Sequence, residues 1–275
     1  AHLEGRRAIV VVPDGALWDV PFQALVSTRG RFLVDDHAFA YAPSLTVLRE
    51  MRRLADARPV RTDATLFALG NPVVAPATAS SRVSTLMDGG GFAPLPEAEQ
   101  QVRRLGELYG RSRSAVFVGA DAREQRAKRD AGQYSVMHLA THGVLDDHSP
   151  MYSYVVLAPD ATRDGDDGVL EAREIMNLRL ASDLVVLSAC ETGRGRFGRG
   201  EGVIGMAWAL FVAGVPATVV SQWKVDAAST SDLMVAFHRS LRASTTRAGG
   251  FAKAEALQRA SREVLADARY RHPFY

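Results

Sequence analysis

The sequence predicts an α/β fold with a mostly parallel central sheet and helices on both faces. Short apolar runs of four to seven residues alternate with segments of helical spacing, which is typical of parallel strands joined by helical crossovers. Two of these runs, 136–141 and 184–189, are almost entirely apolar, as strands buried on both faces are. The length of 275 residues is sufficient for one large domain with a substantial core.

The first elements along the chain are small. We expect a strand over Ala8–Val12 that ends at the turn Pro13-Asp14-Gly15, with a hairpin partner that includes Ala38–Tyr41. Ser44 is placed to cap a helix from Leu45 to about Ala55. Thr65–Leu69 predicts the next strand, and Gly70-Asn71-Pro72 halts it.

The middle of the chain begins with a stretch, 73–96, that is rich in Ala, Pro, Ser and Gly. We interpret it as a long surface loop. A helix over Glu97–Leu108 and a strand over Ser114–Val118 follow, and Asp121 is placed to cap a charged helix that reaches about Asp130.

The remaining elements surround the two apolar runs. The expected order is a strand over Tyr154–Leu157, an acidic turn over 160–168, a helix over Ala172–Leu178, a Gly- and Arg-rich loop over 193–202, a helix over Val203–Ala213, a strand over Thr218–Gln222, and helices over Ser229–Ser240 and Phe251–Leu265.

Composition excludes several classes of protein. The net charge of +2 gives no general attraction to nucleic acid or membranes, and 47% hydrophobic with 23% charged residues is ordinary for a globular protein. One cysteine cannot form an internal disulfide and fits a reducing, cytoplasmic location. We find neither a signal peptide nor an apolar stretch long enough to span a membrane.

Each of the two apolar runs ends at a residue of a nucleophile–base pair. His142 and Gly143 follow the first, and Cys190 closes the second. The carboxyl ends of neighbouring parallel strands share one rim of a sheet, so the thiol and the imidazole should lie close together. A thiolate held by imidazole is a nucleophile, and the backbone N–H groups of Gly143 and Cys190 can stabilise an oxyanion. The alternative is a small buried cysteine beside an ordinary loop histidine.

Longer motifs around this pair resemble the CHAT family of caspase-like peptidases, which are related to separases and often joined to tetratricopeptide repeats. The motifs are "HLATHGVLDD", "DGVLEAREIMNLRL", "DLVVLSACETGRGRFGRGEG" and "AWALFVAGVPATVVSQWKVDAAST", with "VPDGALWDVPFQAL", "ALGNP", "LPEAEQQV" and "GADAREQ" before them in the same order. The resemblance covers nearly the whole chain. It implies a caspase-like three-layer sandwich and a catalytic dyad of His142 and Cys190, and a separation of roughly 50 positions is that of the caspase signature.

The predicted function is therefore that of a cysteine endopeptidase which cleaves protein or peptide substrates through a thioester acyl-enzyme, without metal or cofactor. Two alternatives remain open: a caspase-like scaffolding domain that acts by binding partners, and acyl transfer from the same thioester.

We expect a single domain over 1–275, with an N-terminal subdomain (1–96) and a catalytic part (97–275) on one continuous sheet. The missing initial Met and the abrupt end after Tyr275 predict a fragment of a longer protein, and the resemblance implies an upstream repeat region or a regulatory partner. It also implies a further apolar strand after "HPFY", which this chain lacks.

Several other residues are candidates for a role in substrate binding or near the site, but no specific reaction step follows from their residue types. Trp223 and Asp226 follow the strand after the cysteine and are placed to bind substrate. Asp226 either pairs with a basic P1 side chain or caps the next helix, and Trp223 is as readily a core residue. His138 lies about 13 Å from His142 along a strand, so we expect a buried, hydrogen-bonded residue and no metal site. His148 is solvated or at the pocket rim, and loop 193–202 is mobile or processed.

Overall fold

The computed structural model describes residues 3, 5–58, 63–74, 92–146, 148–160, 166–188, 190–191, 201–221, 225–244 and 251–270. For Cys190, Glu191 and residues 201–204 it describes the backbone only. No helix among these residues is both long and apolar enough to cross a membrane.

The central element is a five-stranded, fully parallel sheet. Its strands lie in the order β11-β9-β5-β3-β4. The bounds are β3 Leu66–Pro72, β4 Ser114–Gly119, β5 Val136–Ala140, β9 Leu184–Leu187 and β11 Thr218–Val220. Each strand runs close to its predicted range, and the two apolar runs, β5 and β9, lie side by side in the interior of the sheet.

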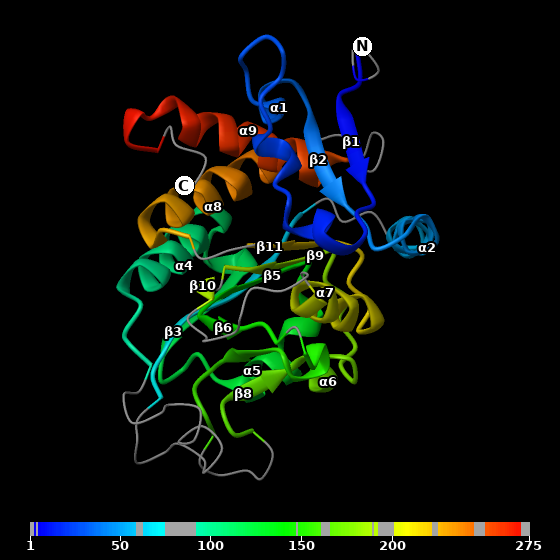
Figure 1. The fold of residues 1–275 in the computed structure, drawn as a ribbon. Coiled ribbons are helices and arrows are strands. Elements are labelled where there is room, and N and C mark those ends of the chain that lie inside the picture. Colours follow the sequence, from blue (N-terminus) through cyan, green and yellow to red (C-terminus); the bar gives the residue numbers. More distant parts are fainter. Residues whose placement is uncertain are drawn as a thin grey trace.

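Helices cover both faces of this sheet (Figure 1). One core cluster joins α4, α8 and α9 to one face, and a second joins α5, α6 and α7 to the other. The bounds are α4 Pro96–Tyr109, α5 Glu124–Arg129, α6 Ala172–Ile175, α7 Glu201–Val212, α8 Ala227–Ala243 and α9 Ala252–Ala266. The predicted α/β sandwich is therefore confirmed.

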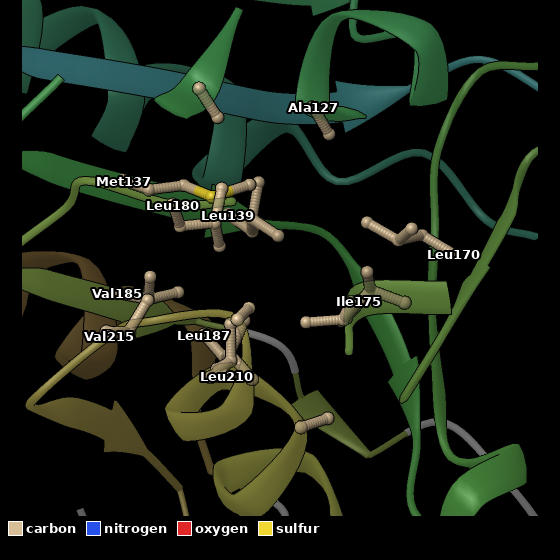
Figure 2. Packing of buried hydrophobic residues seen from close by; sticks show 14 of the residues in the cluster. Ala127, Met137, Leu139, Leu170, Ile175, Leu180, Val185, Leu187, Leu210 and Val215 are labelled. Carbon is tan, nitrogen blue, oxygen red and sulfur yellow. The ribbon is translucent and has the colours of Figure 1, made fainter. Parts of the chain in front are cut away.

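Alternation along the strands explains how two cores form. In β5, Met137 and Leu139 belong to the cluster with α7, whereas Val136 and Ala140 belong to the cluster with α4 and α8. Figure 2 shows the cluster between the sheet and α7, with Leu210 of α7 beside Leu187 of β9. Both faces of the sheet are buried, which is why its strands read as continuous apolar runs.

The expectation of one continuous sheet is wrong, because the strands in the described part of the chain form three sheets. A four-stranded sheet has the order β10-β6-β7-β8, with bounds β6 His142–Val144, β7 Tyr154–Val156, β8 Val169–Glu171 and β10 Cys190–Glu191. Only Thr141 separates β5 from β6, and its hydroxyl donates to the carbonyl of Val156 at the end of β7. The chain thus passes directly from β5 in the main sheet to β6 in the four-stranded sheet, where it pairs with β7 and β10.

The N-terminal hairpin is also corrected. β1 (Ala8–Val11) and β2 (Ala38–Tyr41) pair in parallel, apart from the main sheet. The connection between them contains two 3₁₀ turns (Gly15–Asp19 and Phe22–Ala24) and α1 (Leu33–Asp36), which is long enough to return the chain to the same end.

Arg58 links the N-terminal part to the segments that precede β9 and β11 of the main sheet. α2 (Leu45–Asp56) begins at Ser44, whose hydroxyl accepts from Val47 N as expected. Two residues after α2, the Arg58 guanidinium donates to the Asp183 carboxylate and to backbone carbonyls before β9 and before β11. Those carbonyls belong to Leu180, Ala181, Ser182 and Gly214.

Two further boundaries differ from expectation. Asp121 does not cap α5, which begins at Glu124 without a side-chain cap; the Asp121 carboxylate lies 3.8 Å from Arg126 instead. Residues 201 and 202, expected in the Gly- and Arg-rich loop, already belong to α7. Residues 193–200 of that loop lie outside the described residues, as do 75–91 of the predicted surface loop.

Candidate active site

The backbones of His142 and Cys190 are paired. The β5–β9 ladder runs to Leu139 and Leu187, and Ser188 N then donates to Leu139 O at 2.8 Å. The two chains stay together beyond this point, and β10 pairs with β6 in parallel with Cys190 directly opposite His142. Neighbouring strands lie about 4.8 Å apart. Two residues that are distant in the sequence therefore become lateral neighbours at one rim, as expected.

His142 is buried, with 4% of its surface exposed. Its Nε2 lies 2.8 Å from the carbonyl oxygen of Ala93. Because a carbonyl can only accept, this nitrogen carries the proton in the hydrogen bond. Nδ1 is then the basic nitrogen of the neutral ring.

The ring of Phe92 packs against the imidazole, with 5.2 Å between centroids. Burial lowers the pKa of His142 below its usual value, and the hydrogen bond to Ala93 opposes that shift. His142 is therefore neutral at neutral pH, which is the form that can accept a proton from a thiol.

Phe92 and Ala93 were not identified from the sequence, because they belong to the stretch expected to be a surface loop. A backbone carbonyl leaves no mark in a sequence. The single usable sign was Phe92 itself, a large aromatic residue in a stretch of small ones.

A second contact missed from the sequence joins α4 to the segment before Cys190. Gln101 is 2% exposed, and its Nε2 lies 3.2 Å from the hydroxyl of Ser188. Ser188 is thereby held both by β5 through its backbone and by α4 through its side chain. This fixes the end of β9 at the point where the chain continues towards Cys190.

Gly143, the expected oxyanion residue, lies within β6. It is in register with Glu191 of β10 on one side and with Val155 of β7 on the other. Its backbone is thus next to that of the cysteine-bearing strand.

Asp226 is the N-cap of α8. Its carboxylate accepts from Ser229 N at 2.8 Å, and its carbonyl accepts from the Ser229 and Thr230 hydroxyls. The capping role left open by the sequence is therefore present. Trp223 lies outside the described residues.

His138 is fully buried and hydrogen-bonded, as expected. Its Nδ1 lies 3.1 Å from Nε2 of His238 on α8, whose Nδ1 lies 3.0 Å from the Tyr109 hydroxyl on α4. Burial holds the pKa of both histidines well below the usual value, so they are neutral. His148 is exposed, and its backbone N–H donates to Asp146.

No group of three or more His, Cys, Asp or Glu side chains that could hold a metal ion occurs within the described parts of the chain.

Comparison with known proteins adds two findings. The family model described as "CHAT domain" matches residues 1–275. Tetratricopeptide repeat protein 28 of Mus musculus and its counterpart in Homo sapiens are each 24% identical over 303 aligned residues. The alignments cover 98% of this chain but 12% of those relatives, so the chain spans about an eighth of their length.

Proposed function

The chain belongs to the CHAT domain family, and on that premise we propose that it is a cysteine endopeptidase with Cys190 as nucleophile and His142 as base. The observation that carries the proposal is the β10–β6 register, which sets the two residues opposite each other. Side chains of residues paired in this way project from the same face of a sheet. The neutral, buried His142 supplies a base of suitable protonation.

The proposed reaction has two halves. The Cys190 thiol gives its proton to His142, and the thiolate attacks the scissile carbonyl carbon. Backbone N–H groups of Gly143 and Cys190 stabilise the oxyanion. The C–N bond then breaks, His142 returns the proton to the leaving amine, and a thioester remains. Water, deprotonated by His142, adds to the thioester and releases the acid and the free thiol.

The ring orientation is part of this proposal. The Ala93 carbonyl holds the Nε2 proton, so Nδ1 is the nitrogen that exchanges a proton with the thiol. Ala93 thus plays the part of a third group that orients the base.

Substitution of the pair tests the proposal. Cys190→Ala and His142→Gln should each lower the rate of peptide cleavage by about a hundredfold or more, because each removes a group that makes or breaks a bond. A thiol-reactive peptide electrophile should label the unsubstituted chain at Cys190 and label the His142→Gln variant far more slowly. His37→Gln, which changes a histidine of the N-terminal part, is the matched control. Unchanged cleavage in the Cys190→Ala variant would refute the proposal.

The same labelling separates the alternatives. A scaffolding domain that acts only by binding partners would show no dependence of labelling on His142. Acyl transfer uses the same residues as hydrolysis, and added amine acceptors would divert the thioester to a new amide.

We propose that Trp223 and Asp226 line the substrate groove, with Asp226 pairing a basic P1 side chain. Asp226→Asn separates this role from capping, because asparagine still accepts from Ser229 N but carries no charge. A peptide-library profile should show a preference for basic P1 residues that this variant loses. An apolar P1 profile in the unsubstituted chain would contradict the assignment.

The wider organisation is proposed on the same premise. We propose one peptidase domain over 1–275, with parts 1–96 and 97–275, in a longer cytoplasmic protein. Its access would be controlled by an upstream repeat region or a partner protein. The relatives are named for tetratricopeptide repeats, and this chain corresponds to a small part of them.

A further inference from the structure

Asn71 has a costly backbone conformation at the rim of the main sheet. Its φ is +47°, and it is the non-glycine residue with positive φ in the described part of the chain. The left-handed region is strained for a non-glycine residue, although asparagine tolerates it better than most. Such conformations persist where the surroundings require them.

The Asn71 side chain uses both ends of its amide. Oδ1 accepts from Leu95 N at 2.7 Å, and Nδ2 donates to Glu99 Oε2 at 2.9 Å. The other oxygen of Glu99 accepts from Arg103 at 2.8 Å. Hydrogen bonds from Asn71 and Arg103 lower the pKa of Glu99, so this carboxylate is ionised. Asn71 thus pins the chain just before α4 and the first turn of α4 itself.

Gly70 makes these contacts possible. A Cβ at this position would lie 2.6 Å from Val102 Cγ2 and 3.0 Å from Ala98 O. Without a side chain at Gly70, α4 lies directly against the end of β3, and Asn71 reaches both Leu95 and Glu99.

The pinned residue is linked stiffly to His142. Only Pro94, whose φ is fixed by its ring, separates Leu95 from Ala93, and Pro96 restricts the backbone on the other side of Leu95. Ala93 supplies the carbonyl that accepts from His142 Nε2, and Phe92 supplies the ring packed on it. A displacement of Leu95 would therefore move the Ala93 carbonyl.

We propose that Asn71 and Glu99 are positioning residues for His142, acting through Leu95 and the Ala93 carbonyl. They join the "ALGNP" and "LPEAEQQV" motifs, for which the sequence alone indicates no role. The inference rests on the proposed function for its catalytic meaning. Its structural content is that the Asn71 amide keeps the Nε2 proton of His142 hydrogen-bonded.

Three variants test the inference, so that the test does not depend on any single variant folding correctly. Asn71→Gly fits the positive φ but makes neither hydrogen bond. Asn71→Asp still accepts from Leu95 N but sets two carboxylates against each other at Glu99. Combining Asn71→Asp with Glu99→Gln exchanges donor and acceptor, so the amide introduced on α4 donates to the carboxylate introduced near the end of β3 and still accepts from Arg103. Arg103→Ala is the control, because Arg103 contacts Glu99 from outside the path to Ala93.

The direct readout is the ring Nε2–H signal of His142 in the full chain with ¹⁵N-labelled histidine, assigned by its absence in His142→Gln. We expect a slowly exchanging proton in the unsubstituted chain and in Arg103→Ala, its loss in Asn71→Gly and Asn71→Asp, and its return in the double variant. The rate of peptide cleavage should change in parallel with this signal. In the variants that lose the signal, kcat should be lowered about ten- to hundredfold, with KM little changed.

Two results would overturn the inference. One is an unchanged Nε2–H signal in folded Asn71→Gly and Asn71→Asp. The other is a double variant that behaves like Asn71→Asp. The NMR pattern does not depend on proteolysis, so a chain that keeps it while cleaving nothing would refute the proposed function and leave the positioning role standing.

Discussion

Phe92 and Ala93 act on the pKa of His142 in opposite directions. The aromatic ring helps to bury the imidazole, which disfavours its charged form, whereas the carbonyl accepts from the ring N–H and favours that form. Burial is the larger effect. One short segment thus sets both the protonation of His142 and the direction in which its proton-bearing nitrogen points.

Replacing Phe92 by Ala should raise the pKa of His142 towards the ordinary value of about 6.5, because water gains access to the ring. In the proposed reaction His142 must be neutral to accept a proton, so activity at acidic pH should be lost first. The acid limb of kcat/KM should therefore move to higher pH. Phe92→Leu keeps most of the burial and is the control. An acid limb that stays in place or moves to lower pH would show that Phe92 does not desolvate His142.

Among the elements, α7 stands out because it leads out of the segment that follows Cys190. Gly205 within it packs on the 3₁₀ turn Pro150–Tyr152 between β6 and β7. A Cβ at Gly205 would lie 2.4 Å from Pro150 Cβ and 2.9 Å from the Pro150 carbonyl oxygen. Neither the proline ring nor the backbone can move aside easily, so α7 itself would have to shift.

Gly205→Ala should therefore destabilise the chain by about 1–3 kcal/mol through overpacking, even though alanine is the better helix former by about 1 kcal/mol. Gly106→Ala in α4 is a matched control, because the neighbours of a Cβ there would be side-chain atoms only, Val116 Cγ2 at 2.8 Å and Val116 Cβ and Ser114 Oγ at 3.8 and 3.9 Å. Denaturant unfolding measures both. A Gly205→Ala variant as stable as the unsubstituted chain would mean that α7 accommodates the methyl group.

At the scale of the whole molecule, one buried polar chain joins two helices on one face of the main sheet to the sheet itself. Tyr109 of α4, His238 of α8 and His138 of β5 are hydrogen-bonded in series. All three side chains lie in or beside the core cluster that faces α4 and α8. Burial lowers the pKa of His238 to about 3, so the folded state holds this ring neutral where the unfolded chain would protonate it.

This difference predicts an acid-dependent loss of stability. A group whose pKa is depressed by folding contributes stability above the unfolded value, about 6.5, and loses it progressively as pH falls towards 3. From pH 7 to pH 5 the loss should be about 2 kcal/mol for His238. The free energy of unfolding of His238→Gln should fall less over this interval, whereas the exposed His148→Gln variant should keep the original slope. Equal slopes in all three proteins would contradict the prediction.

The sheet and its two helical layers could be predicted from the sequence because both faces of β5 and β9 are buried. A strand that is buried on both faces has apolar residues at successive positions, and such a run is visible in the sequence. The rim position of His142 and Cys190 followed from the same runs. The second sheet could not be predicted, because β6 and β10 are three and two residues long and carry no periodicity. The hydrogen bonds of Asn71 and Ala93 could not either, since they depend on how closely α4 approaches the end of β3.

The β10–β6 pairing is too short to determine its own register. That register is set by the pairing of β9 with β5, which precede β10 and β6 in the chain. A slip of a single position would set Cys190 opposite Thr141 or Gly143 rather than His142. The alignment of the proposed catalytic pair is therefore determined in the buried core, by side chains such as Leu139 and Leu187. Substitutions in that core should accordingly impair the proposed reaction as readily as substitutions at the rim.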